Sequence, residues 1–105
     1  MYGINAYKSV QANTESPWKL IDMLYEGAIE AIRQKNYQKA EKIIDAGLIG
    51  GLNPELEFSQ GLLNVYEIAI ANLYIQPEVS SRVLQTLREG WQEINPDKMP
   101  KQKVG

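Results

Sequence analysis

The spacing of apolar residues predicts a first helix over residues 17–34. Apolar side chains recur there every three or four positions, which places them on one face of an α-helix. This stripe comprises Trp18, Ile21, Leu24 or Tyr25, Ala28 and Ile32. Gly27 and Ala28 are small residues in the middle of the segment, so a neighbouring helix can approach closely there.

The same spacing predicts three further helices. The second begins after Asn36 and ends at Gly50-Gly51, because glycine adopts the left-handed cap conformation without strain. The third covers residues 54–75 and the fourth residues 77–94, and each begins with a proline, which suits the first helical turn.

Each of these helices has an expected core stripe. The stripes are Tyr37, Ala40, Ile43 or Ile44 and Leu48 in the second helix; Phe58, Leu62, Val65 or Tyr66, Ala69 and Leu73 in the third; and Val79, Val83, Leu87, Trp91 and Ile94 in the fourth. The other side of the fourth helix carries Arg82, Gln85, Arg88, Glu89 and Gln92.

The predicted fold is an all-α, antiparallel four-helix bundle. No segment alternates polar and apolar residues with a period of two, so no strand is expected. Short connections favour antiparallel neighbours, and 105 residues suit a single domain. Within residues 1–105 we expect a flexible N-terminal arm over residues 1–15, the bundle over residues 16–95 and a short disordered tail over residues 96–105.

The composition argues against an enzyme. The chain has no cysteine and no histidine, which excludes disulfides, thiolate metal sites and histidine-based catalysis within one chain. Asp22, Glu26 and Glu30 are spaced four residues apart, so they lie on one face of the helix. Carboxylates arranged in this way can bind a metal ion in the core of a helical bundle. We interpret this row as a solvated helix face with Arg33 nearby, and we expect no metal and no cofactor.

The charge pattern predicts neither a nucleic-acid partner nor a membrane partner. The net charge is −2, and basic residues are interleaved with acidic ones except in the short Lys98–Lys103 tail. No apolar run approaches the roughly 20 residues needed to span a bilayer. The first residues lack the basic-then-apolar pattern of a signal peptide, so the expected location is the cytoplasm.

The third helix carries more apolar surface than one buried face requires. Outside its core stripe lie Leu63, Ile68, Ile70, Tyr74 and Ile75. One interpretation is a tightly covered helix or a homodimer seam, and the other is a groove for a partner's amphipathic helix. Tyr2 and Tyr7 in the N-terminal arm either dock on this surface or belong to a disordered leader.

Several segments together carry a family resemblance that covers roughly residues 1–94. They are Met1-Tyr2-Gly3, Asn5-Ala6-Tyr7, Glu15-Ser16-Pro17 with Leu20-Ile21 and Met23-Leu24-Tyr25-Glu26-Gly27-Ala28, then Leu63-Asn64-Val65-Tyr66-Glu67, Leu73, and Val83 to Leu87-Arg88-Glu89-Gly90-Trp91. The second group is similar to the motif S/A-P-x-x-L-I-x-M-L-Y-E-G-A. Together these segments resemble the flagellar secretion chaperone family FliS.

The resemblance implies a four-helix bundle that binds the C-terminal, otherwise disordered segment of flagellin. Such binding prevents premature polymerisation and supports export for flagellum assembly. In the family, the N-terminal arm can lie over part of the binding surface, a place that Tyr2 and Tyr7 would take here. The stretch from Tyr25 to Tyr66 is shorter than the family leads us to expect, by roughly two helical turns on each side of Lys39-Ala40.

The first hypothesis is therefore that the chain is a chaperone, either a monomer or a weak homodimer. Its expected partners are the C-terminal segment of flagellin, with other flagellar regulators as possible further partners. The expected partner-binding residues are Tyr2, Tyr7, Leu20, Leu24, Tyr25, Leu63, Ile70, Leu73 and Tyr74. The second hypothesis is a homodimeric structural or interaction protein without flagellin binding. A third is a helical-repeat scaffold, but only residues 37–48 resemble one repeat and stacking needs about three.

Overall fold

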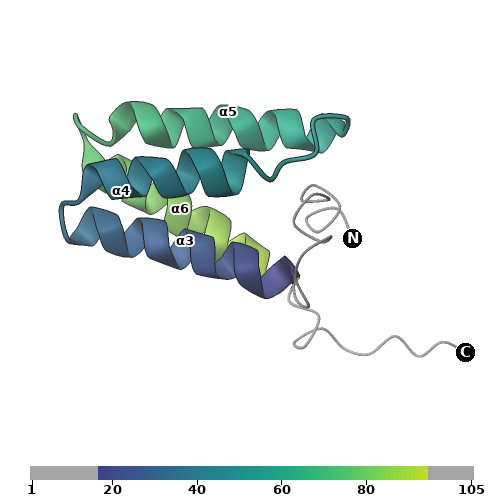
Figure 1. The fold of residues 1–105 in the computed structure, drawn as a ribbon, viewed down its shortest axis with the longest axis horizontal. Coiled ribbons are helices and arrows are strands. Elements are labelled where there is room, and N and C mark those ends of the chain that lie inside the picture. Colours follow the sequence, from purple (N-terminus) through teal and green to yellow (C-terminus); the bar gives the residue numbers. More distant parts are fainter. Residues whose placement is uncertain (1–16, 95–105) are drawn as a thin grey trace, which may run out of the picture.

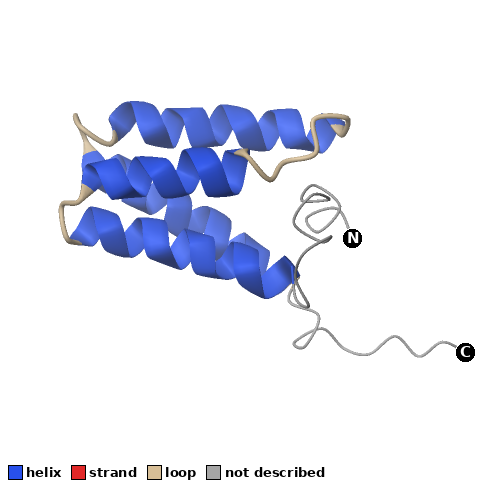
Figure 2. Cartoon of the chain, viewed as in Figure 1, coloured by secondary structure: helices blue, strands red, loops and turns tan. Residues whose placement is uncertain are grey.

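A computed structural model describes residues 17–94, and this part of the chain is a bundle of helices (Figure 1). The elements are α3 (Pro17–Arg33), α4 (Tyr37–Lys42), η1 (Ile43–Ile49), α5 (Glu57–Asn72) and α6 (Pro77–Glu93). The second rod consists of α4 continued by the π-helix η1. Residues 17–94 contain helices and connections but no strand, as Figure 2 shows, so the all-α prediction is confirmed.

Short connections turn the chain back at the end of each rod (Figure 1). In the bundle, α3 packs on α6 and on the second rod, and α5 packs on α6 and on η1. Within the bundle, α3 and α5 therefore lie diagonally opposite each other across the core. The bundle therefore has two opposite seams, one between α3 and α6 and one between the second rod and α5.

Apolar side chains from all four rods form the core. The buried apolar residues are Ile21, Tyr25, Ala28, Ala31, Ile32, Ala40, Ile44, Leu48, Tyr66, Ala69, Leu73, Leu84 and Trp91. The hydroxyl groups of Tyr25 and Tyr66 form a hydrogen bond inside this core. Such a bond is expected, because a buried phenol that lacks a partner is costly.

Two details of the predicted core are wrong. Phe58 is 49% exposed, because α5 begins at Glu57 and Phe58 lies in its first turn, on the rim of the buried face. In α6 the fully buried positions include Ser80 and Leu84, whereas Val79 is only half-buried and is not packed against the core; the predicted Val83 is half-buried and does pack against it. The Ser80 hydroxyl donates to the backbone carbonyl of Ala69, so a polar residue fits at a core position.

The end of α3 has the hydrogen bonds of a Schellman motif. The N–H of Asn36 donates to the carbonyl of Ala31 at 2.8 Å, and the N–H of Lys35 to that of Ile32 at 2.9 Å. Lys35 has a φ of 64° and occupies the left-handed position that usually holds glycine. Asn36 then caps α4, because its side-chain oxygen accepts from the N–H of Lys39 at 3.2 Å.

The second rod changes from α-helix to π-helix at Ile43. At its end the N–H of Gly50 donates to the carbonyl of Asp45, five residues back, at 2.9 Å. Gly50 has a φ of −61°, so the expectation of a left-handed glycine is wrong at this position. Glycine is required there for space, because a Cβ on Gly50 would lie 2.3 Å from the carbonyl oxygen of Ala46.

Gly47 allows η1 to pack closely on α3, because a Cβ there would lie 3.0 Å from Cδ2 of Leu24. At Gly27 a Cβ would lie 3.5 Å from Cδ1 of Ile43, which is ordinary van der Waals contact. The helix that approaches α3 beside Gly27 is therefore η1, and the tight position is on η1 itself.

Polar groups join α3 to α6 on the other side. The indole N–H of Trp18 donates to the carbonyl of Trp91 at 2.8 Å, and that of Trp91 to the carbonyl of Trp18 at 2.9 Å. The two rings are stacked, with centroids 6.5 Å apart and planes 8° from parallel. We call this arrangement the tryptophan pair. It ties the start of α3 to the end of α6.

One member of the acidic row also belongs to this seam. Arg88 donates to Asp22 at 2.9 Å and 3.3 Å, and Gln92 donates to the same carboxylate at 3.3 Å. The pKa of Arg88 is raised from its ordinary value, chiefly by its hydrogen bond to Asp22. The solvated-face interpretation is therefore wrong for Asp22, while Glu30 does form an exposed pair with Arg33.

Candidate partner-binding site

Three of the predicted contact residues lie close together: Leu63 and Ile70 along one edge of α5, and Tyr74 in the turn just after it. Leu63, Ile70 and Tyr74 are seven and four residues apart, a spacing that keeps them on the same side of a helix. Leu63 and Ile70 are half-buried and Tyr74 is 56% exposed. This edge faces the second rod, and we call the strip where α4 and η1 lie beside α5 the partner seam.

Aromatic rings mark one end of the partner seam. Tyr74 and Tyr37 of α4 meet edge to face, with ring centroids 6.0 Å apart. The hydroxyl of Tyr74 donates to Glu41 at 2.9 Å. This hydrogen bond is the main reason why the pKa of Tyr74 is raised above its ordinary value.

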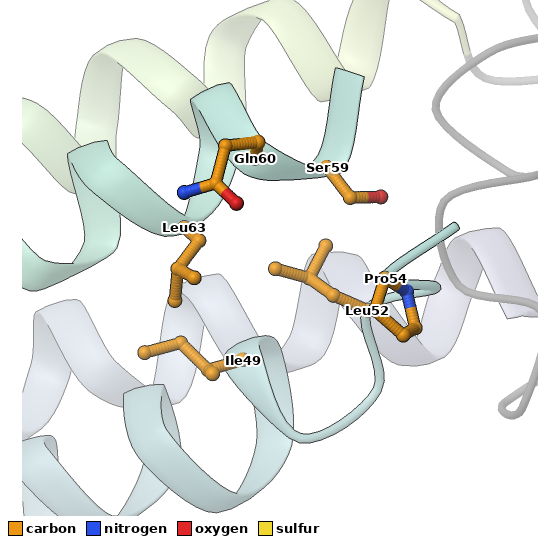
Figure 3. A pocket seen from close by; sticks show the side chains of 6 residues that line it. All are labelled: Ile49, Leu52, Pro54, Ser59, Gln60 and Leu63. Carbon is orange, nitrogen blue, oxygen red and sulfur yellow. The ribbon is translucent and has the colours of Figure 1, made fainter. Parts of the chain in front are cut away.

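A pocket of about 280 Å³ marks the other end, where η1 connects to α5 (Figure 3). Its walls are Ile49, Leu52, Pro54 and Leu63, with the polar residues Ser59 and Gln60 beside them. In Figure 3, Leu63 and Ile49 lie at one end and Ser59 and Pro54 at the other. The partner seam thus offers an apolar hollow with few polar groups, which is typical of a binding site.

The remaining predicted contacts are not on this surface. Tyr25 is 2% exposed and Leu73 is fully buried, so both serve the core and are not accessible to a partner in this conformation. Leu24 is half-buried beside Gly47, and Leu20 is 37% exposed on α3. Because α3 and α5 lie diagonally opposite each other, the structure does not bring Leu20 together with the α5 edge.

Two predicted contacts, Tyr2 and Tyr7, lie outside the described residues. The structure adds five pocket residues that were not predicted as contacts, namely Ile49, Leu52, Pro54, Ser59 and Gln60. Ile49 and Leu52 carried a usable signal, because they are apolar residues flanking a glycine pair in a connection. The burial of Ser59 depends on how α5 packs against η1, and no local pattern shows it.

Among residues 17–94, no group of three acidic side chains is arranged to hold a metal ion. No helix in the same range combines the length and apolar character that crossing a membrane requires. The partner seam itself presents aliphatic and phenolic side chains, a carboxylate and two neutral polar groups.

The chain matches the model of a known protein family. The model of a family described as "Flagellar protein FliS" matches residues 1–98 of the chain. No curated protein and no solved structure matches significantly.

Proposed function

Because the chain belongs to the FliS family of flagellar chaperones, we propose that it binds the C-terminal segment of flagellin in the cytoplasm. Binding there covers surfaces that flagellin uses to polymerise and keeps the segment ready for export. The mechanism is steric: a partner segment is held by burial of apolar surface, and no chemical step is involved.

The observation that carries this proposal is the partner seam. A monomeric bundle has no structural need for a hollow lined by Ile49, Leu52 and Leu63 at one end of this seam and an exposed Tyr74 ring at the other. A disordered segment loses conformational entropy when it binds, which costs free energy. Burial of a large apolar surface along the seam is needed to offset this cost.

Calorimetric titration of the full chain with the flagellin C-terminal segment tests the proposal. We expect saturable one-to-one binding with a strongly negative heat-capacity change, the mark of apolar burial. Leu63→Asp and Ile70→Asp should each weaken binding at least about tenfold, because a charge replaces a buried contact. Ile70 also packs against the core, so Ile70→Asp should lower stability as well.

Two variants on the same helix serve as controls. Ile68 is 52% exposed on the outer face of α5, so Ile68→Asp should leave both binding and folding unchanged. Leu73 is fully buried, so Leu73→Asp should prevent folding. Absence of binding by the wild-type chain, or equal losses from Leu63→Asp and Ile68→Asp, would contradict the proposal.

The outer face of α5 favours a second candidate function, a homodimeric interaction protein. Ile68 is 52% exposed on that face, and Ile75 is 75% exposed in the turn that follows α5. Analytical ultracentrifugation over a wide concentration range distinguishes the two. A dimer that Ile68→Asp dissociates, together with no affinity for flagellin, would support this second candidate.

A further inference from the structure

The glycine that follows η1 is needed for space and not for flexibility. Gly50 has a φ of −61°, which any residue adopts. Its N–H donates to the carbonyl of Asp45, five residues back, at 2.9 Å. An α-helix uses the carbonyl four residues back, which here belongs to Ala46. The π-turn skips that carbonyl, and its oxygen occupies the space that a Cβ on residue 50 needs. A side chain at this position is therefore incompatible with the π-turn.

The π-turn determines the direction of the Ile49 side chain. In an α-helix, residues five apart differ by about 140° around the axis, so an α-helix that buries Ile44 directs Ile49 away from the core. In a π-helix the hydrogen bonds span five residues, so residues five apart lie on the same face. The structure has the second arrangement: Ile44 is fully buried, and Ile49 packs against the core and lines the pocket between η1 and α5.

Ile49 forms the η1 side of this pocket. Among the described residues that line the pocket, Ile49 alone belongs to η1, while Leu52 and Pro54 come from the connection to α5. Ile49 and Leu63 of α5 line the same end of the pocket (Figure 3). A second rod that was α-helical throughout would keep its buried residues but would lose this apolar wall. Short π-turns inside helices are frequent at functional sites for this kind of reason.

We propose that Gly50 is a positioning residue of the partner seam. Because it lacks a Cβ, it permits the π-turn, and the π-turn directs Ile49 toward α5, where Ile49 contacts an apolar side chain of the partner. The inference rests on the proposed function for the identity of this partner, the C-terminal segment of flagellin. The direction of Ile49 is a property of the free chain and is tested separately.

NMR of the free, isotope-labelled full chain tests the geometry. Scalar coupling across the hydrogen bond should link the amide nitrogen of Gly50 to the carbonyl carbon of Asp45. A nuclear Overhauser effect should link the methyl groups of Ile49 and Leu63. In Gly50→Ala the coupling should move to the carbonyl of Ala46, and the effect between the methyl groups should disappear. A wild-type coupling to Ala46, or a variant that keeps both wild-type signals, would overturn the inference.

Calorimetric titration with the flagellin segment tests whether Gly50 acts through Ile49. Ile49→Ala should weaken binding about tenfold, because it removes an apolar contact. Gly50→Ala should weaken binding by the same factor, and the double variant should be no weaker than either, because both changes remove one contact. Independent effects would multiply to about a hundredfold, which would refute the positioning role. The control Gly61→Ala in α5 meets no atom within 4 Å and should bind like the wild type.

A deletion should rescue the Gly50→Ala variant. Removal of Ala46, an exposed residue, brings Asp45 and residue 50 to a spacing of four, so their hydrogen bond closes an α-turn. Ile44 and Ile49 are then also four apart and stay on one face. Gly50→Ala combined with this deletion should therefore regain wild-type affinity. If Gly50→Ala alone does not fold, the combined variant decides the matter, and its failure to fold or to bind would contradict the inference.

Failure of the positioning role differs from failure of the chaperone proposal. Equal flagellin affinity of the wild type and Gly50→Ala would refute the positioning role and leave the chaperone proposal intact. If the wild type does not bind flagellin while the NMR signals of the free chains change as expected, flagellin is removed as the partner and Gly50 remains the residue that directs Ile49 into the partner seam.

Discussion

At Lys35 the backbone adopts a conformation that its side chain disfavours. The left-handed region costs a non-glycine residue roughly 1–2 kcal/mol, and this residue has a φ of 64°. The turn persists because Asn36 completes two hydrogen-bonded motifs, one that ends α3 and one that begins α4. The surrounding contacts thus maintain a strained residue at the first connection.

Lys35→Gly should therefore stabilise the protein. The relief of strain is partly offset by the greater freedom of glycine in the unfolded chain, about 0.4–1 kcal/mol, so we expect a net gain of about 0.5–1 kcal/mol. The free energy of unfolding from urea denaturation measures it. Lys42→Gly, in the middle of the second rod, is the matched control and should lose about 1 kcal/mol.

Among the elements, η1 is the one that the sequence did not reveal. Periodicity and three prolines placed the four rods close to their observed bounds. A π-helix escaped detection because Ala40, Ile44 and Leu48 recur every four residues, a spacing that an α-helix also accommodates. The start of α5 was placed too early, because Asn53 forms a turn in which its side chain accepts from the N–H of Glu55.

Gly50→Ala tests how the π-helix ends. The added Cβ would lie 2.3 Å from the carbonyl oxygen of Ala46, so the last turn of η1 must distort. We expect a loss of about 1–3 kcal/mol in the free energy of unfolding, the usual range for overpacking. Gly90→Ala in α6 meets no atom within 4 Å and should gain about 1 kcal/mol instead. Equal effects of the two variants would show that space at Gly50 is not limiting.

At the scale of the whole molecule, the sequence predicted the class of fold better than it predicted the site. Helical patterns show which face of a rod is buried but not which rods become neighbours. Leu20 and Leu63 were predicted to share one surface, but they belong to helices that lie diagonally opposite each other. Tyr25 and Leu73 were predicted to contact a partner, but both are buried in the core. Leu63, Ile70 and Tyr74 were predictable because the predicted third helix, residues 54–75, carries more apolar residues than one buried face requires. That surplus can be recognised without knowing which helices are its neighbours.

The tryptophan pair closes the bundle on the side opposite the partner seam. Trp18→Phe removes one indole hydrogen bond and weakens the stacking, so the free energy of unfolding should fall by about 1–2 kcal/mol. Affinity for a partner at the seam should stay the same, because α3 and α6 do not form it. Loss of affinity in this variant would mean that the two seams are coupled.

The chain has two tryptophans, and both belong to this pair. Emission excited at wavelengths that tryptophan absorbs and tyrosine does not therefore reports on the contact between α3 and α6. Chemical unfolding should change the emission strongly, whereas a ligand lacking tryptophan that enters the opposite seam should leave it almost constant. Tryptophan emission can therefore be used to follow folding of this protein even while a partner binds at the partner seam.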